Sequence, residues 1–323
     1  MKVLGLSFGR KNGNCDLLLK QALTGAKSTG AEVTYINTCN LKIDRCTGCG
    51  ACDKVREKGG MSVCLLKDDF PFVEGAMMDA DAIIAAAPVY SVAPVGQYKN
   101  LCDRMGASHD RSALIRENER RKELGWGEER MLDSKYFKNR PLGLISVGGA
   151  RTPGWTAMGL SSMHIIGFSN QMIPVDAVDA YGMGDRVHPV FDKEFMERIY
   201  CLGKNIGDAL KLPKEEVKWM GDNDGTCPVC HCNQLTVRDG VTVECSVCGM
   251  VGELQLKEGK IKVEFPKEQW ERSRYRLGGL MEHNDEINSM KERFMAKMEK
   301  DGDQIPDLVK PLHEIKEMKP RRV

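Results

Sequence analysis

The sequence lacks three features that would place it in a membrane, outside the cell or on nucleic acid. No run of 18 apolar residues occurs among its 323 residues, so we expect no membrane-spanning helix. The apolar stretch 2–7 is too short for a secretory signal, and Arg10 and Lys11 follow at once. The formal net charge is only +1, from 47 basic and 46 acidic residues, which gives nucleic acid no general attraction. We therefore expect a cytoplasmic protein that binds neither membranes nor nucleic acid.

Histidine is also scarce, with 6 residues, whereas cysteine is abundant, with 13. Without a secretory signal, thiols in this number indicate metal and redox sites in a reducing compartment, and hint at an anaerobic host. The remaining composition is that of an ordinary soluble protein, with 41% hydrophobic and 29% charged residues. The length allows one large domain and one or two small ones.

A compact cysteine run near the N-terminus is the first candidate metal site. Its spacing is C-x2-C-x2-C-x11-C, and its members are Cys46, Cys49, Cys52 and Cys64. Gly48 and Gly50 allow tight turns between the thiols, because glycine tolerates positive φ. Such a run is typical of a [4Fe-4S] cluster. Two alternatives stay open: structural thiols without a cluster, or Cys39 as a ligand if the long last spacing misplaces Cys64.

A second set consists of two CxxC pairs separated by 14 residues: Cys227, Cys230, Cys245 and Cys248. Asp239-Gly240 between the pairs is a strong hairpin signal. Two such pairs joined by a hairpin predict a zinc ribbon, whose closed four-thiolate site is structural. Iron in the same site would transfer electrons, but the short gap and the missing glycine after Cys230 favour zinc. His231 and Cys232 are expected to be bystanders.

Apolar patterns alternate between strands and helices through the first 210 residues. Strands are predicted at 2–7, 32–37, 82–87, 142–147 and 171–175, and helices at 14–29, 70–79, 94–104, 156–166 and 191–210. This alternation predicts an α/β fold with a doubly wound parallel sheet. A mixed-charge helix at 116–130 interrupts the pattern, and we expect either a solvated excursion or a lid or dimer arm.

We predict three parts along the chain. They are an α/β domain at 1–212 with a cysteine loop at 39–64 and an insertion at 107–138, a zinc-ribbon domain at 213–266, and a C-terminal helix and tail at 267–323. The C-terminal helix is expected over 267–300, with a loosely packed tail after it. The sequence does not say whether this helix covers the ribbon or serves a subunit interface.

The loop after the first strand, SFGRKNGNC, predicts a ligand site. Its small and polar residues can turn backbone N–H groups inward, and the following helix begins with partial positive charge, so the loop suits a phosphate. The chain has neither GKS/T nor GxGxxG here, which excludes the two commonest nucleotide loops and favours a monophosphate. The alternative is a plain turn that Asn14 caps.

Two further strand ends carry residues that can bind a ligand, at 88–91 and 148–151. In a doubly wound sheet, ligands bind outside the carboxyl ends of the strands. Backbone amides at 89–91 and 149–151 could bond the edges of a flat ring, and Tyr90 or Trp155 could stack on it, although either aromatic could instead be a packing residue. The sequence therefore predicts a site for a planar molecule that carries one phosphate.

These segments together resemble the flavodoxin-like NADPH-dependent FMN reductase family, and within it the iron–sulfur flavoproteins. The resemblance rests on SFGRKNGNC, CTGCGAC…CLLKDD, APVYSVAP…KNLCDRMG and SVGGARTPGW, and it covers residues 1–210 apart from the insertion. It implies a five-stranded parallel sheet in the order 2-1-3-4-5. It also implies FMN, with its phosphate at Ser7, Arg10, Asn12, Asn14 and Cys15 and its ring along Pro88, Val89, Tyr90, Ser91, Gly149, Ala150 and Arg151. The sequence departs from the family at Cys15, where a threonine or serine is usual, and in the longer spacing before Cys64.

The combined pattern predicts an FMN-dependent oxidoreductase. Electrons would pass from NAD(P)H or a reduced carrier such as ferredoxin, through FMN and a [4Fe-4S] cluster beside it, to a protein or small-molecule acceptor. The alternatives are a non-enzymatic electron carrier and a zinc-ribbon interaction module with a flavin sensor. Tyr90, Arg151 and His164 are the candidate catalytic residues. The resemblance also implies a homodimer or homotetramer.

Overall fold

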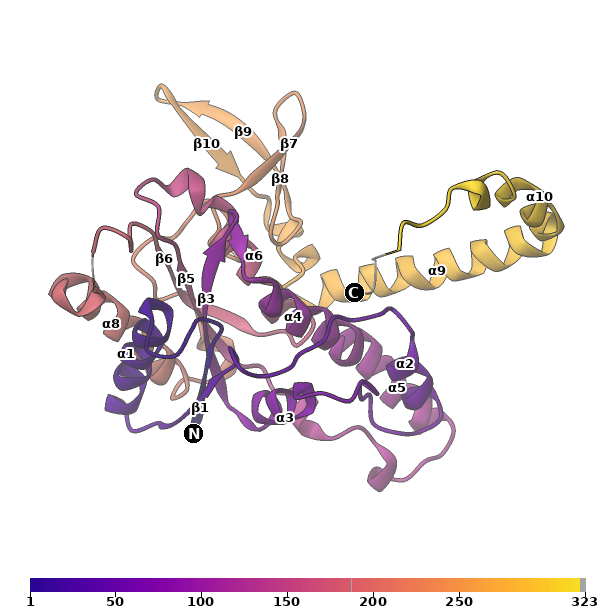
Figure 1. Ribbon diagram of the computed structural model, residues 1–323, viewed down its shortest axis with the longest axis horizontal. Helices are drawn as coiled ribbons and strands as arrows, with labels where there is room; N and C mark the ends of the chain where they lie inside the picture. The colour runs from indigo at the N-terminus through magenta and orange to yellow at the C-terminus, as the bar shows by residue number, and fades with distance from the viewer. Residues whose placement is uncertain (187, 320–323) are drawn as a thin grey trace. The chain divides into compact units, whose positions relative to one another are not determined.

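A twisted parallel β-sheet lies at the centre of the first 210 residues (Figure 1). The computed structural model describes residues 1–186 and 188–319. The parallel strands run in the order β2-β1-β3-β5-β6. Their bounds are β1 (Lys2–Ser7), β2 (Glu32–Asn37), β3 (Ala82–Tyr90), β5 (Pro141–Val147) and β6 (Ile173–Ala180). This order confirms the predicted flavodoxin-like sheet, to which the short β4 (Ala93–Pro94) adds an antiparallel pairing with the end of β3.

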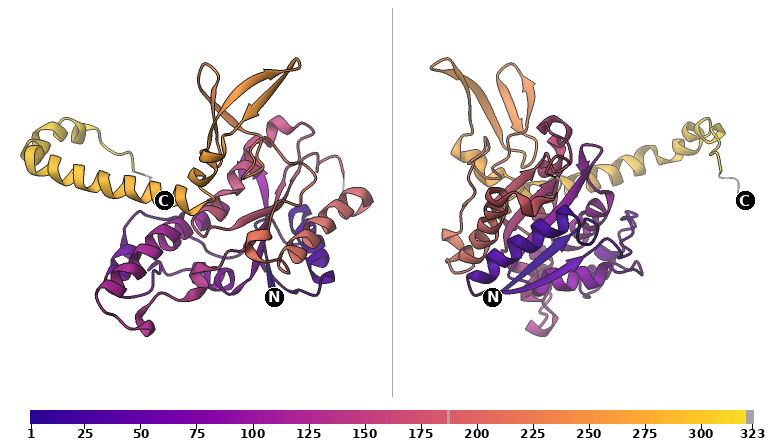
Figure 2. Two further views of the ribbon diagram at one scale, coloured as in Figure 1. Left: turned by 180° about the vertical axis from the view of Figure 1, so that it is seen from behind. Right: turned by 60° about the vertical axis from the view of Figure 1, so that its left-hand side comes forward.

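Helices cover both faces of this sheet, as the two views in Figure 2 show. On one face lie α1 (Asn14–Ser28) and α8 (Lys193–Ala209), and on the other lie α3 (Phe70–Asp79), α4 (Gly96–His109), α6 (Ala157–Met163) and α7 (Ile165–Phe168). Alternate residues of β3 serve the two cores: Ile84 packs with α1 and α8, and Ile83 packs with α3 and α4. The helices α1 and α8 approach closely, because a Cβ on Gly203 would lie only 1.6 Å from the Ala22 carbonyl oxygen.

Several element boundaries differ from the sequence prediction. The last strand spans 173–180 rather than 171–175, and the helix predicted at 156–166 is divided into α6 and α7. The helix of the insertion is α5 (Arg111–Glu123) rather than 116–130, because the Asp110 side chain accepts the Ala113 N–H and begins the helix earlier. Gly125, at φ +71°, follows its end.

The insertion supports the cysteine loop, which corrects the expectation of a solvated excursion. Arg121 on α5 is 1% exposed and donates to the carbonyls of Gly60 at 2.7 Å and Arg56 at 3.2 Å. Its neighbour Arg120 donates to the Glu57 carbonyl at 2.9 Å. The loop itself contains a short helix that the sequence did not predict, α2 (Ala51–Glu57). Residues of the insertion thus supply the hydrogen bonds that hold the end of α2 and the turn after it.

An antiparallel sheet follows α8, in the order β10-β9-β8-β7. Its bounds are β7 (Leu235–Asp239), β8 (Thr242–Cys245), β9 (Val251–Lys257) and β10 (Lys260–Glu264). Gly240, at φ +53°, forms the predicted hairpin turn. Buried Tyr275 joins this ribbon to the parallel-sheet domain, since its hydroxyl lies 2.7 Å from Nδ1 of His164 and its ring packs on Phe168. Residues 1–280 form one compact unit.

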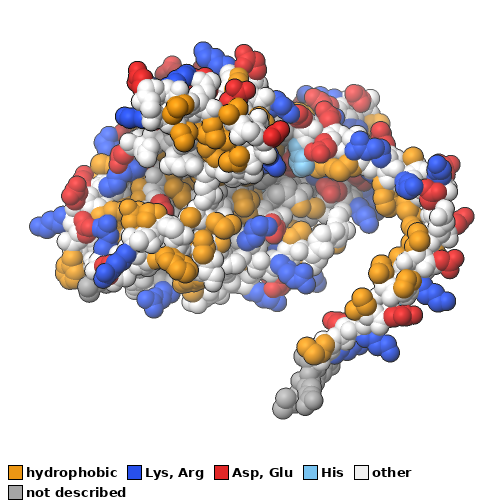
Figure 3. All heavy atoms as spheres, turned by 90° about the horizontal axis from the view of Figure 1, so that it is seen from above, with side chains coloured by type: hydrophobic (Ala, Val, Ile, Leu, Met, Phe, Trp, Pro, Cys, Tyr) orange, Lys and Arg blue, Asp and Glu red, His pale blue; other side chains and the backbone are white. Residues whose placement is uncertain are grey.

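The C-terminal helix begins later than predicted. Lys267–Arg272 is a 3₁₀ helix, and α9 spans Leu277–Asp301, because the residues between them turn so that Tyr275 enters the ribbon core and Arg274 N–H bonds the Cys248 carbonyl at 2.9 Å. Residues 281–323 form a second unit, which includes most of α9 and α10 (Ile305–Val309). Apolar side chains lie exposed along α9 (Figure 3), among them Ile287 and Met290.

Short 3₁₀ helices complete the described chain at Glu128–Arg130, Ser134–Phe137, Pro153–Trp155, Pro189–Phe191, Lys214–Glu216, Gly302–Gln304 and Leu312–Glu314. In the described residues, no helix combines the length and the hydropathy that crossing a bilayer requires.

Candidate functional site

A pocket of about 250 Å³ opens at the carboxyl ends of the parallel strands. Seven of the predicted cofactor residues line it: Arg10, Asn14, Cys15, Pro88, Val89, Tyr90 and Gly149. Six further residues also line it. Gly9, Gly13 and Gly148 belong to the loops that the sequence singled out, whereas Val147, Met183 and Gly184 were missed. Six predicted residues are not in the lining: Ser7, Asn12, Ser91, Ala150, Arg151 and Trp155. The loops after β1, β3 and β5 therefore meet at one pocket, and a fourth loop, after β6, joins them.

The N-terminus of α1 faces this pocket without a side-chain cap. Gly13 occupies the cap position and cannot offer an oxygen, so the first-turn N–H groups of Asn14 and Cys15 have no acceptor within the helix. Asn12 precedes them in the left-handed conformation, at φ +59°. Free N–H groups and the positive end of a 15-residue helix suit a phosphate group.

Asp16 stabilises the loop at residues 7–15, which we call the phosphate loop, through hydrogen bonds. Its buried carboxylate accepts the Asn12 N–H at 2.9 Å, the Asn37 side-chain amide at 2.8 Å and the Tyr35 hydroxyl, and it pairs with Lys20. Burial alone would raise the pKa of Asp16, but the hydrogen bonds from Lys20, Tyr35 and the Asn12 backbone bring it below its usual range. The group is therefore a carboxylate at neutral pH, and its network fixes the loop's left-handed residue.

Cys15 presents a neutral thiol to the pocket. Burial raises its pKa to about 12, so the thiolate is negligible at neutral pH. Ser7, the last residue of β1, is fully buried beside it and bonds the Cys15 side chain, which explains why Ser7 supports the pocket instead of lining it. A neutral thiol carries no charge that would repel a phosphate, although it donates weakly.

Two loops form the opposite wall by pairing their backbones. Met183 N–H bonds the Gly148 carbonyl at 3.0 Å, and Gly184 N–H bonds the Gly149 carbonyl at 3.1 Å. The approach requires glycine, because a Cβ on Gly184 would lie 2.9 Å from the Gly149 oxygen. In the described part of the chain, no backbone acceptor bonds the N–H groups of Gly149, Ala150 or Arg151. These donors are available to the edge of a flat ligand.

The candidate catalytic residues lie at different places. Tyr90 lines the pocket and is 62% exposed, whereas Arg151 stands outside the lining and pairs with Asp185 at 2.5 Å. Trp155 is 69% exposed and is also outside the lining. His164 is buried against Tyr275, and burial lowers its pKa to about 4. The structure therefore brings only Tyr90 of these four to the pocket.

The turn that follows Tyr90 is strained. Ser91 and Val92 adopt φ +51° and +74°, a region that β-branched residues rarely occupy. The turn connects β3 to β4 at the pocket edge, and the Val95 N–H bonds the Pro88 carbonyl at 3.0 Å. Strain of this kind costs about 1–3 kcal/mol per residue and concentrates at functional sites.

A second pocket, of about 180 Å³, is lined by all four cysteines of the N-terminal run. Gly48 and Gly50 adopt φ +66° and +65°, as the spacing predicted, and the Gly48 N–H lies 3.5 Å from the Cys46 sulfur. The Cys52 thiol lies 3.6 Å from the Ala107 carbonyl of α4. Within the described residues the four sulfurs do not converge to within 4.8 Å of one another, so they surround a space instead of filling it.

A buried arginine also lines this cysteine pocket. Arg104 of α4 is 1% exposed and forms an ion pair with the fully buried Asp68 carboxylate. Its Nε and Nη2 atoms have no hydrogen-bond partner among the described residues. Burial lowers the pKa of Arg104, but Asp68 and the Cys64 sulfur raise it above its ordinary value. A buried cation with unused donors, beside four thiols, fits an anionic thiolate-bound cluster.

The two pockets lie at opposite ends of α4. Val89 and Tyr90, which line the first pocket, pair with β4 immediately before the helix, and Ala107 and Ser108 at its other end line the cysteine pocket. The pockets share no lining residue. At 1.5 Å per residue, about 16 Å of helix separates Gly96 from Ala107. The expectation that the cysteine loop lies beside the flavin site stays a prediction.

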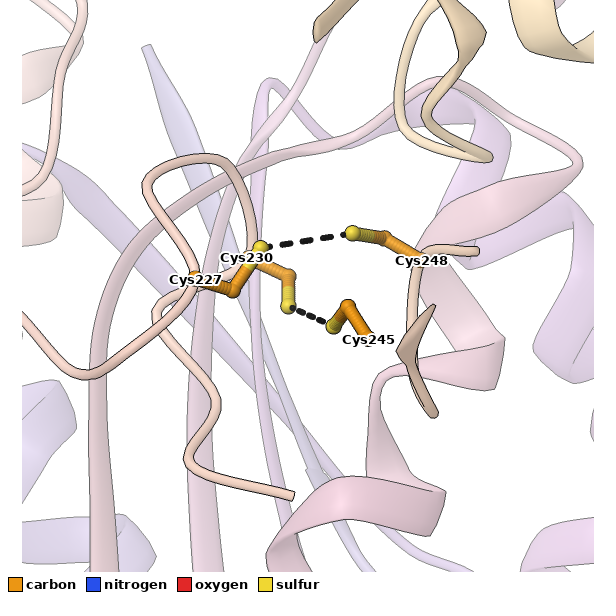
Figure 4. A group of neighbouring side chains, drawn as sticks. All are labelled: Cys227, Cys230, Cys245 and Cys248. Carbon is orange, nitrogen blue, oxygen red and sulfur yellow. Dashed lines mark hydrogen bonds between the residues drawn. The ribbon is translucent and has the colours of Figure 1, made fainter. Parts of the chain in front are cut away.

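The cysteines of the ribbon come together as one group that could hold a metal ion, as their spacing predicted (Figure 4). All four side chains are buried, and their sulfurs lie within 4.8 Å of one another: Cys227, Cys230, Cys245 and Cys248. Sulfur atoms of Cys227 and Cys248 are 3.4 Å apart, and those of Cys230 and Cys245 are 3.5 Å apart. These separations are too long for disulfides and near the roughly 3.8 Å edge of a tetrahedron with 2.3 Å metal–sulfur bonds.

Each of the two CxxC pairs of the ribbon is followed by a residue in the left-handed conformation. Gly249 follows the second pair at φ +78°, and His231 takes the equivalent conformation after the first pair, at φ +59°. The His231 ring stacks on Trp219 at 4.2 Å and its Nδ1 lies 2.8 Å from the Asp224 carbonyl, which together hold this unusual conformation. Cys232 lies next to the centre but outside the four-sulfur group.

This chain belongs to the NADPH-dependent FMN reductase family, whose model matches residues 1–181. The chain is therefore a flavin-dependent oxidoreductase with a flavodoxin-like sheet. An iron–sulfur flavoprotein of Methanosarcina thermophila is 34% identical over 214 residues, which are 66% of this chain and 96% of that protein.

Two other similar proteins extend over nearly the whole chain. A flavone synthase of Aspergillus candidus is 28% identical over 299 residues, which are 89% of this chain and 88% of that protein. A solved structure described as a flavone reductase is 27% identical, with a TM-score of 0.82, and covers 99% of this chain and 100% of that one. The likeness to the flavone reductase structure includes the ribbon and the C-terminal helix.

Proposed function

We propose that the protein is an NAD(P)H-dependent FMN oxidoreductase that reduces a planar conjugated compound of the flavone class. FMN supplies hydride chemistry at its ring. The phosphate loop, with the first-turn N–H groups of Asn14 and Cys15, would bind the FMN phosphate, and the backbone donors at Gly149 and Ala150 would bond the ring edge. The observation that carries this proposal is the meeting of an uncapped helix N-terminus with unused N–H donors in one pocket.

The choice of acceptor rests on the pocket rim and on the two similar proteins that span the chain. Tyr90 lines the pocket with its ring 62% exposed, which suits stacking on a flat substrate. Both of the proteins that resemble this chain over almost its full length are named for flavones. The sequence expectation left the acceptor open, and a flavone is the first compound to test.

A steady-state assay tests this function. Protein purified anaerobically should oxidise NADH or NADPH in the presence of a flavone and yield the product reduced at its conjugated double bond. The Tyr90→Ala variant should keep its FMN and lose flavone turnover by tenfold or more. If no nicotinamide is oxidised while reduced ferredoxin still bleaches the flavin, the proposal is wrong and the chain is an electron carrier.

The second candidate is that electron carrier, in which FMN and a [4Fe-4S] cluster exchange electrons between proteins. The cysteine pocket with its buried Arg104 favours it, because Cys46, Cys49, Cys52 and Cys64 would supply the four thiolates. Flavin, iron, sulfide and zinc should be quantified for each chain. About four irons support the cluster, and one zinc supports a structural ion at Cys227, Cys230, Cys245 and Cys248. Zinc without iron or sulfide would reduce the N-terminal run to structural thiols.

Subunit association remains a part of this proposal. The exposed apolar side chains of α9 suit contact with a second copy, as a homodimer or homotetramer requires. Light scattering of the holoprotein measures the mass directly. A monomer across the micromolar range would contradict the expectation. A redox partner protein such as ferredoxin is expected only under the electron-carrier alternative.

A further inference from the structure

Arg104 is the single cation among the residues that line the cysteine pocket, in the part of the chain that the structure describes. We infer that Arg104 is a positioning residue for an iron–sulfur cluster there, which donates hydrogen bonds to the cluster's sulfurs and raises its reduction potential. This inference rests on the proposed cluster, and it concerns a residue that the flavin chemistry does not use.

The burial of Arg104 requires a compensating acceptor. Its side chain is fully buried, and Asp68 accepts from Nη1, which also lies 3.4 Å from the Asp44 carbonyl. The Phe70 ring lies 4.0 Å from the guanidinium carbon and can accept no ordinary hydrogen bond. The Nε and Nη2 donors therefore remain unpaired within the described residues. Leaving buried charged donors unpaired is unfavourable, so a ligand that occupies the pocket is the expected acceptor.

The orientation of the ion pair fits this role. Asp68 also accepts the backbone N–H groups of Asp44 at 2.8 Å and Phe70 at 3.1 Å, so its carboxylate is fixed beside Arg104. The influence of the Cys64 sulfur on the pKa of Arg104 places that thiol near the guanidinium. Arg104 thus contacts the Asp68 carboxylate and lines the cysteine pocket together with Cys64.

A second buried arginine shows what a purely structural role looks like. Arg140 is 0% exposed, and its donors reach the carbonyls of Ala80, Met78, Lys135 and Lys138 at 2.6–3.2 Å. All of its nitrogens are used by the protein, and it lines neither pocket described above. Arg104 differs because its Nε and Nη2 atoms have no oxygen or nitrogen acceptor among the described residues, and the Cys64 sulfur is the neighbour that raises its pKa.

The physical effect follows from charge. Four thiolates outweigh the positive core of a [4Fe-4S] cluster, so the bound cluster is an anion and becomes more negative on reduction. A buried guanidinium with N–H groups toward sulfur stabilises the reduced state more than the oxidised state. Removing it should therefore make the cluster harder to reduce, and should leave the FMN potential unchanged because FMN occupies the other end of α4.

Three variants test the inference: Arg104→Met, Arg104→Lys, and the double change of Arg104→Met with Asp68→Asn, which avoids a lone buried carboxylate. The matched control is Arg140→Met. Each holoprotein is reconstituted anaerobically with iron and sulfide, and the FMN and zinc contents confirm that it folds. The cluster potential is then measured by a redox titration followed by electron paramagnetic resonance, separately from the flavin potential.

We expect the cluster potential to shift to more negative values in Arg104→Met and in the double variant, less in Arg104→Lys, and not in Arg140→Met. The cluster of Arg104→Met should also be lost faster to a chelator. Unchanged potentials in variants that hold a full cluster would overturn the inference alone. A native protein that binds FMN but takes up no iron or sulfide would overturn the proposed cluster as well. If the cluster potential shifts in Arg104→Met but the native protein does not reduce flavones, only the proposed substrate is wrong.

Discussion

The two four-cysteine sites of this chain bury their sulfurs to different extents. In the ribbon, all four side chains are buried and their sulfurs already lie within 4.8 Å of one another. In the N-terminal run, Cys49 is exposed, the other three are partly exposed, and the thiols surround a pocket of about 180 Å³. The ribbon site suits one ion that holds a fold together, whereas the N-terminal site suits a larger group that contacts solvent or a partner.

This difference shows that cysteine spacing alone does not determine how deeply a group of thiols is buried or what packs around it. Both runs have thiols two residues apart, yet only the ribbon builds its hydrophobic cluster around the thiols, with Met250 and Tyr275 fully or almost fully buried among them. The N-terminal pocket is held by side chains from elsewhere, Arg104 on α4 and Arg121 on α5. Cysteine substitutions should therefore lower the unfolding free energy strongly at the ribbon and only slightly at the N-terminal run.

The largest effect is expected at the ribbon. The Cys230→Ser variant should lose its zinc and the fold of residues 213–276, with a loss of about 5 kcal/mol or more from the unfolding free energy of that part, because metal binding and folding are coupled there. The neighbouring Cys232→Ser variant is the matched control and should keep both. Zinc content and thermal unfolding measure the outcome. If Cys230→Ser lost its zinc and still unfolded at the same temperature as the native protein, the ribbon site would not be coupled to folding, and this prediction would be wrong.

A pH dependence is expected where the ribbon meets the parallel-sheet domain. Burial lowers the pKa of His164 to about 4, below the value of about 6.5 in the unfolded chain. The unfolded state therefore binds the proton more readily, and stability falls as the pH decreases from about 6.5 toward 4, by about 3 kcal/mol in total. Denaturant unfolding at pH 5 and pH 7 should show a smaller difference for His164→Gln than for the native protein. An equal difference in both would show that another group titrates.

A moderate effect is expected at the support of the cysteine loop. The Arg121→Met variant removes donors from the Gly60 and Arg56 carbonyls and should destabilise the loop by about 2 kcal/mol. Arg120→Met removes from the loop only the bond to the Glu57 carbonyl, made by a side chain that is 40% exposed, so it should cost less, about 0.5 kcal/mol. Hydrogen exchange of residues 51–64 reports the loop directly. Protection as high as in the native protein in both variants would mean that α5 does not hold the loop.

The smallest effect on stability is expected in the N-terminal run itself. The Cys49→Ser variant should lose the iron–sulfur cluster yet change the unfolding free energy of the metal-free protein by less than about 1 kcal/mol, because the side chain is exposed. Cys39→Ser, also exposed, should keep the cluster. Iron content and denaturant unfolding separate the two properties. A cluster that is lost from Cys39→Ser and kept in Cys64→Ser would make Cys39 the fourth ligand in place of Cys64.

Local patterns in the sequence predicted most of the fold and about half of the flavin pocket lining. The strands at 2–7 and 32–37 and the helix from Asn14 follow from apolar periodicity, and both glycines of the cysteine run adopt the expected positive φ. Met183 and Gly184 were missed because they reach the pocket by pairing with a loop more than 30 residues earlier. Arg104 was missed for the same reason, since its partner Asp68 lies 36 residues away and no short motif joins them.

The bond between Tyr275 and His164 limits how the chain could be shortened. A fragment that ends at Leu210 would contain the whole parallel sheet, but it would expose Phe168 to water and leave the His164 ring without the hydroxyl that it faces. Gly167 was selected for contact as well, because a Cβ there would lie 2.8 Å from the Tyr275 ring. Residues 1–210 therefore do not form an independent flavodoxin domain. To express them alone, His164 and Phe168 would have to be replaced by residues that tolerate contact with water.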